Sequence, residues 1–125
     1  MHAEAPESLK VSLEEISKPE KEKELKEFAL KVFDWNKTTN LVSKNSTLEN
    51  IYNHIIDSAH LYPYIQDNSY IDVGSGAGFP GLVISILGNK DGCLLEPANK
   101  KASFLRHCLA PVSYTHLTLP TTIEV

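Results

Sequence analysis

The stretch Tyr70-Ile-Asp-Val-Gly-Ser-Gly-Ala-Gly-Phe-Pro-Gly81 decides the fold class of this chain. It starts as an apolar run too short for a helix and passes through three glycines. It then leads into a helical pattern whose buried face carries Leu82, Val83, Ile86 and Leu87. Because proline is favoured in the first turn of a helix, Pro80 predicts that the helix begins there. A strand, a glycine loop and a helix in this order are typical of a parallel α/β sheet.

The residues after this helix predict a second strand and a second helix. A turn-forming cluster over residues 88–92 precedes the short apolar strand Cys93-Leu-Leu-Glu96. The segment 97–109 then predicts a helix with an inward face made of Phe104, Leu105, Cys108 and Leu109. We therefore expect residues 63–110 to begin a Rossmann-like α/β domain.

The region before Tyr70 predicts helices only. Apolar residues recur at helical spacing in three segments, Leu9–Ile16, Leu25–Phe33 and Leu48–Ala59. Two capping boxes, Ser17-Lys-Pro-Glu20 and Ser46-Thr-Leu-Glu49, predict where the second and third helices begin. We expect residues 1–62 to form an N-terminal helical region.

The glycine loop and a following acid predict a site for a nucleoside ligand. Gly74, Gly76 and Gly78 allow a tight turn and let a ligand approach the backbone at the amino end of a helix. Glu96 ends the next strand, 22 residues after Gly74, where a carboxylate can accept hydrogen bonds from both ribose hydroxyls. A glycine-rich turn beside an exposed glutamate is the structural alternative.

The loop resembles the first motif of class I S-adenosyl-L-methionine-dependent methyltransferases. Its spacing is Asp72-x-Gly-x-Gly-x-Gly followed by bulky Phe79, whereas the glycine pattern of NAD domains serves a pyrophosphate. The resemblance implies that the cofactor is S-adenosyl-L-methionine, that the loop passes its methionine part, and that Asp72 meets the ammonium group. An NAD(P)-binding oxidoreductase and a non-catalytic ligand- or partner-binding module are the alternatives.

A closer resemblance is to the bacterial small-subunit (16S) ribosomal RNA guanine-N7 methyltransferase family, also called the glucose-inhibited division protein B family. Four stretches carry it in order: Trp35-Asn-Lys-Thr-Thr-Asn-Leu41, His54-Ile-Ile-Asp-Ser58, Asp72-Val-Gly-Ser-Gly-Ala-Gly-Phe-Pro-Gly-Leu82 and Leu95-Glu-Pro-Ala-Asn-Lys-Lys-Ala-Ser-Phe-Leu105. The family usually has an arginine where this chain has Asn53, so a role of that arginine does not carry over. The resemblance implies a cytoplasmic enzyme that methylates N7 of a guanine in 16S ribosomal RNA or the small ribosomal subunit. It also implies that Gly74 and Phe79 line the cofactor pocket.

Two polar clusters are candidates for the substrate side. His54, Asp57 and Ser58 lie at i, i+3 and i+4 of one predicted helix, which excludes the relay geometry of a hydrolytic triad. They predict either a border of the substrate mouth or a hydrogen-bond cluster on the helix face. Lys100, Lys101 and Arg106 predict a small basic face that meets phosphate, or else a solvated helix face. No residue is assigned a catalytic role, because N7 of guanine already carries a lone pair and needs no general base.

Composition and charge limit these interpretations. The net charge of the 125-residue chain is −4, so an RNA partner requires a local basic patch. The apolar runs are too short to span a membrane, and the N-terminus lacks the apolar core of a secretory signal. Cys93 and Cys108 have no metal-ligand spacing, so we expect free thiols and no metal. We infer no membrane partner and no obligate protein partner.

The last residues predict a segment of foreign origin. Val112 to Thr121 back-translates as GTC TCT TAT ACA CAT CTG ACG CTG CCG ACG, the end of a transposon followed by its sequencing adapter. The same frame reaches a stop codon after Val125. We therefore expect residues 111–125 to be adapter-encoded, the methyltransferase sheet to be truncated, and this fragment to be inactive. A genuine β-rich tail is the alternative.

Overall fold

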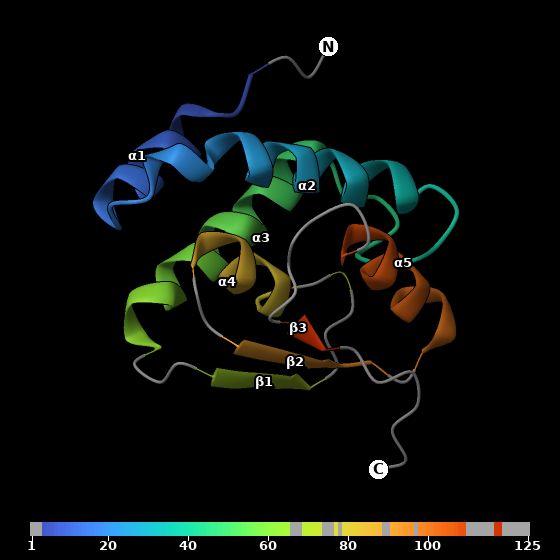
Figure 1. Cartoon of the computed structure of the whole chain (residues 1–125). Helices are drawn as coiled ribbons and strands as arrows, with labels where there is room; N and C mark the ends of the chain where they lie inside the picture. The colour runs from blue at the N-terminus through green and yellow to red at the C-terminus, as the bar shows by residue number, and fades with distance from the viewer. Residues whose placement is uncertain are drawn as a thin grey trace.

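The chain folds into helices that lie together on one side of a small parallel sheet (Figure 1). The computed structural model describes residues 4–65, 69–73, 77, 79–88, 91–96, 98–109 and 117–118. The helices are α1 (Glu7–Glu15), α2 (Glu22–Trp35), α3 (Leu48–Leu61), α4 (Gly81–Leu87) and α5 (Asn99–Leu109). Short 3-10 turns cover Pro19–Lys21 and Tyr62–Tyr64. The strands are β1 (Ser69–Val73), β2 (Asp91–Leu95) and β3 (Leu117–Thr118).

The sheet has the order β1-β2-β3, so β1 is an edge of the described sheet. β1 and β2 pair in parallel, from Ser69 opposite Asp91 to Val73 opposite Leu95. β1 lies where the sequence predicts the first strand, and α4 connects it to β2. β2 begins at Asp91, two residues before the predicted start at Cys93, and it ends at Leu95, so Glu96 follows the strand. β3 adds a parallel pairing of only two residues, with Gly92 opposite Leu117. This third strand falls in the segment for which we expect a foreign origin.

One apolar core joins the N-terminal helices to the α/β part. The helical periodicity predicts most of the buried faces, and every residue of α4 is buried. Phe33 and Leu48, which the periodicity placed on these faces, are only half-buried. The cluster runs without a break from α1 to α5, with fully buried members that include Leu13, Leu25, Ile55, Leu87 and Phe104. Burial of apolar surface is the main source of stability for such a fold. No helix among the described residues is long and apolar enough to cross a membrane.

The predicted start of the second helix is wrong. Ser17 has a left-handed backbone, with φ of 60°, and belongs to the end of α1. The Ser17 amide donates to the Glu14 carbonyl at 3.1 Å, and the Lys18 amide donates to the Leu13 carbonyl at 2.8 Å. These two bonds form a Schellman motif, which satisfies carbonyls at the end of a helix. A 3-10 turn follows, and α2 begins at Glu22 with no side-chain cap.

The capping box of α3 lies one residue later than predicted. Thr47, and not Ser46, is the capping residue. Its hydroxyl accepts a hydrogen bond from the Asn50 amide at 3.1 Å, while the Asn50 side-chain oxygen accepts one from the Thr47 amide at 3.0 Å. The amide of Asn50 thus takes the place of the glutamate that the prediction assigned to this bond.

Candidate functional site

The carboxyl ends of β1 and β2 carry the two acids that the sequence singles out. Asp72 is the fourth residue of β1, paired with Leu94, and Glu96 directly follows β2. Both strands run in the same direction, so both acids come to the same edge of the sheet. In an open parallel sheet this is the edge at which ligands bind. In Figure 1 it is the edge from which the chain continues into α5.

Asp72 fixes the start of α4. Its Oδ2 accepts a hydrogen bond from the Gly81 amide at 3.0 Å. A Cβ atom added at Gly81 would lie 2.6 Å from that oxygen and would overlap the side chain of Leu94. Glycine is therefore needed where α4 approaches the two strands most closely. The structure shows this positioning role, and a contact of Asp72 with a cofactor ammonium group stays a prediction.

Glu96 is a buried carboxylate. Its exposed fraction is 5%, so the alternative of an exposed glutamate does not describe this chain. One carboxylate oxygen accepts a hydrogen bond from the Ala98 amide at 2.9 Å, which orients the side chain just before α5. Burying a charge is unfavourable unless hydrogen bonds compensate for the lost water. The ribose prediction requires an oriented carboxylate at this place, and its contact with a ribose stays a prediction.

The end of the glycine loop is held by the N-terminal helices. Gly74, Gly76 and Gly78 lie outside the described residues. The half-buried ring of Phe79 lies 5.4 Å from the His54 ring of α3, at an angle of 33°. On α2, the Phe28 ring lies 5.6 Å away in an edge-on arrangement. Aromatic pairs of this geometry add to the stability that burial alone supplies. The N-terminal helices therefore hold Phe79 in place as well as cover the sheet.

The predicted cluster on α3 is only partly brought together. The Ser58 hydroxyl is buried and donates to the His54 carbonyl at 2.8 Å, so it serves the helix itself. His54 and Asp57 instead line an open groove of about 400 Å³, which we call the amide groove. Its other lining residues are all polar: Ser43, Asn45, Ser46, Asn50 and Asn53. The structure thus brings His54 and Asp57 to one groove, and their place at a substrate mouth stays a prediction.

Lys100 and Lys101 line a second groove, of about 350 Å³, between residues 38–40 and 98–101. We call it the basic groove. Sequence reasoning missed the wall formed by Thr38, Thr39 and Asn40, because it assigned these three residues no place in a site. The family resemblance could have indicated these residues, since they belong to one of the four stretches that carry it.

Asn36 fixes the connection that borders both grooves. It is 9% exposed, and its side-chain oxygen accepts hydrogen bonds from the Leu41 amide at 2.9 Å and the Val42 amide at 3.0 Å. Its side-chain nitrogen donates to the Ser43 carbonyl at 3.1 Å. One buried side chain thereby sets the path of residues 36–43 after α2 ends. The sequence contains this residue in the family stretch but does not reveal its role.

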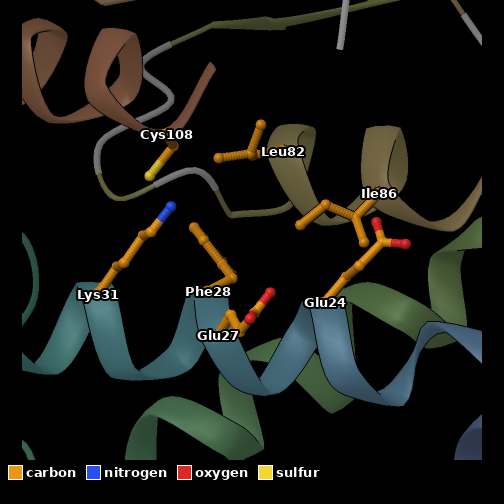
Figure 2. Close-up of a pocket in the computed structure, with 7 residues that line it drawn as sticks. All are labelled: Glu24, Glu27, Phe28, Lys31, Leu82, Ile86 and Cys108. Atoms are coloured by element: carbon orange, nitrogen blue, oxygen red, sulfur yellow. The ribbon is translucent and has the colours of Figure 1, made fainter. Parts of the chain in front are cut away.

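A third cavity, between α2, α4 and α5, is too small for a cofactor. Its volume is about 50 Å³, which is room for water, whereas ligand pockets begin at roughly 300 Å³. Figure 2 shows Lys31 of α2 extending towards Cys108 of α5 in this cavity. Burial raises the pKa of the Cys108 thiol to about 12, and this effect outweighs the positive charge of Lys31, which lowers the pKa. Cys108 is therefore an inert structural thiol; the side chain of Cys93 lies outside the described residues.

The family model and the similar proteins that match this chain carry the same name. Residues 21–122 match the family model described as rRNA small subunit methyltransferase G. This range includes residues 111–122, where we expected no family resemblance. No solved structure gives a significant match.

Three similar proteins are called ribosomal RNA small subunit methyltransferase G. The one from Histophilus somni is 39% identical over 84 residues, which is 66% of this chain and 40% of that protein. The one from Mannheimia succiniciproducens is 36% identical over 110 residues, or 87% of this chain and 51% of that protein. The one from Rickettsia bellii is 47% identical over 73 residues, or 57% of this chain and 38% of that protein. The chain thus spans about two fifths to a half of the relatives it matches.

Proposed function

Because the chain belongs to the rRNA small subunit methyltransferase G family, we propose that it is the N-terminal part of an enzyme that methylates N7 of a guanine in 16S ribosomal RNA. Membership of this family implies a class I methyltransferase fold. The observation that carries the proposal is the pair of acids at the carboxyl ends of β1 and β2, with Phe79 at the end of the loop between them.

The residues present fit S-adenosyl-L-methionine. Glu96 is a buried, oriented carboxylate that suits the two ribose hydroxyls. Asp72 brings a negative charge to the loop that would pass the methionine part, together with Gly74, Gly76, Gly78 and Phe79. When bound, the cofactor supplies a methyl group on a positively charged sulfur. The protein has to hold the cofactor and exclude water around it.

The amide groove is the proposed place for the guanine. Asp57 offers carboxylate oxygens to the ring N–H and amino group of guanine, which are both donors, and Asn50 and Asn53 offer amides. His54 joins this groove to the glycine loop, because its ring packs on Phe79. Hydrogen bonds at the far edge of the base leave N7 open for the methyl group. N7 has its own lone pair, so orientation is the main contribution of the protein.

The remaining part of the enzyme is proposed to follow residue 110. The relatives are about 2 to 2.5 times as long as the part that matches this chain, as their coverages of 51% and 40% show, and β1 is an edge of the described sheet. We call the protein that continues the native reading frame beyond residue 110 the parent protein. Residues 111–125 are proposed to be adapter-encoded. The 125-residue fragment is proposed to be inactive, because it spans only about two fifths to a half of its relatives and β1 is an edge of the described sheet.

Methyl transfer by the parent protein tests this function. The purified protein is incubated with tritiated S-adenosyl-L-methionine and small ribosomal subunits, and N7-methylguanine is located by reduction and aniline cleavage of the RNA. We expect label at one guanine of the 16S RNA, and none with the 125-residue chain. Label on another atom or base, or no label with the parent protein, would contradict the proposal.

A matched pair of variants tests the amide groove. Asp57→Asn should lower the methylation rate while the dissociation constant of S-adenosyl-L-methionine stays unchanged. Asp34→Asn removes an equal charge from an exposed site on α2 and should have no effect. Equal rates for the two variants would remove Asp57 from the substrate site.

A further inference from the structure

The basic groove differs in charge from the rest of the molecule. The chain has 16 acidic residues against 12 lysines and arginines, yet no acidic residue is among the described residues that line this groove. Lys100 and Lys101 both line it, and neither forms an ion pair with a carboxylate among the described residues. Two unpaired positive charges on one wall create a local potential that attracts anions.

The opposite wall supplies neutral hydrogen-bonding groups. Thr38, Thr39 and Asn40 offer hydroxyls and an amide, which are the side chains that accompany lysine at nucleic-acid phosphates. The Thr38 hydroxyl and the Thr39 amide both donate to the Trp35 carbonyl, at 3.3 Å and 3.0 Å. The wall is therefore attached to the end of α2 and is not a free loop.

The packing of α2 against α5 holds the two walls together. The Trp35 ring lies 5.4 Å from Phe104 and 4.9 Å from His107, both on α5. Asn36 fixes the connection from the other side through its bonds to residues 41–43. Figure 1 shows this connection and α5 on the same side of the molecule. The groove is thus shaped by buried contacts before any ligand binds.

We propose that the basic groove binds backbone phosphates of the RNA substrate, with Lys100 and Lys101 as the charged contacts. This inference rests on the proposed function. The α2–α3 connection borders both grooves, with residues 38–40 on the basic groove and Ser43, Asn45 and Ser46 on the amide groove. An RNA strand that crosses the connection places its backbone in one groove and the target base in the other. The basic groove is then the local basic patch that the acidic chain requires.

The salt dependence of RNA binding tests the proposal. The parent protein is titrated into a fluorescein-labelled RNA hairpin with a guanine in its loop, at KCl concentrations between about 50 and 200 mM. Each phosphate contact on single-stranded RNA contributes about 0.7 to the slope of log affinity against log salt. K100A/K101A should therefore lower that slope by about 1.4, and its affinity deficit should shrink about sevenfold between 50 and 200 mM KCl.

Three controls separate electrostatics from misfolding. K100R/K101R keeps both charges and should restore the slope of the parent protein. K10A/K23A removes two lysines from α1 and α2 that do not line the groove, and should leave the slope unchanged. Trp35, the only tryptophan in the sequence, provides a second signal, because its fluorescence should change when RNA enters beside residues 38–40.

Each outcome decides the question. An unchanged slope for K100A/K101A overturns the proposal, although RNA methylation by the parent protein would stand. No RNA binding by the parent protein overturns the proposed function and this inference with it. Inorganic phosphate is titrated at constant ionic strength. If it changes the Trp35 fluorescence but RNA does not, the groove is a small-anion site and the proposal is wrong.

Discussion

Gly81→Ala tests the close approach of α4 to the two strands. The added Cβ would lie 2.6 Å from Asp72 Oδ2 and 3.0 Å from Asp72 Cβ, and would overlap the side chain of Leu94. Leu94 is fully buried, and the Asp72 oxygen is held by the Gly81 amide, so neither can move at no cost. Overpacking of this kind costs about 1–3 kcal/mol. The better helix propensity of alanine offsets up to about 1 kcal/mol of that.

Gly81→Ala is expected to lower the free energy of unfolding by about 1–2 kcal/mol, since the cost of the clash exceeds the gain in helix propensity. For a protein of the size of the relatives this lowers Tm by roughly 2–8 °C, at about 2–4 °C per kcal/mol. Thermal melts of the parent protein and the variant, monitored by far-UV circular dichroism, measure this change in Tm. Ser103→Ala, at an exposed site on α5, is the control and should shift Tm by less than the variant at Gly81. A Gly81→Ala protein with the Tm of the parent protein would refute the close approach and the positioning role of Asp72.

Three further predictions concern the connection, the buried thiol and the reaction. Asn36→Ala removes three hydrogen bonds, so it should destabilise the parent protein by roughly 1–3 kcal/mol and weaken RNA binding; wild-type stability would contradict the role assigned to Asn36. Burial raises the pKa of Cys108 from 9.0 to about 12, so the stability linked to the protonated thiol is complete below pH 9 and is lost as the pH rises towards 12. Cys108 should therefore resist iodoacetamide at pH 8, and rapid labelling of the native protein would disprove its burial. Single-turnover methylation should show no ionisation of an essential general base between about pH 6 and 9. A rate that rises tenfold per pH unit across this range would contradict the orientation mechanism.

The α/β part is predictable from sequence because short-range patterns decide it. An apolar run, three glycines and a helix signal leave few options for residues 70–87, and β1 and α4 form there. The end of α1 is harder, because Ser17-Lys-Pro-Glu20 has the composition of a helix start. The structure instead has Ser17 in a left-handed conformation that ends α1. This conformation goes with hydrogen bonds from the Ser17 and Lys18 amides to the Glu14 and Leu13 carbonyls, which composition does not show.

The candidate site is less predictable because its walls come from distant segments. Glu96 is recognisable from its spacing after the glycine loop, but its burial is visible only in the structure. Lys100 and Lys101 were identified as a basic face, while the partner wall at residues 38–40 lies some sixty positions earlier in the chain. Packing of Trp35 on α5 brings these segments together, and no local pattern encodes that contact.

Cofactor binding to the parent protein tests the central claim most directly. Isothermal titration calorimetry should show binding of S-adenosyl-L-methionine and no binding of NAD, because Asp72, the glycine loop and Glu96 suit a methionine and a ribose and not a pyrophosphate. Glu96→Ala should weaken binding by about 1–3 kcal/mol, the usual loss for hydrogen bonds to a charged acceptor. Thr47→Ala, which removes a helix cap on α3, is the control for a loss of stability without loss of a cofactor contact. Binding of NAD without binding of S-adenosyl-L-methionine, or an unchanged dissociation constant for Glu96→Ala, would contradict the account.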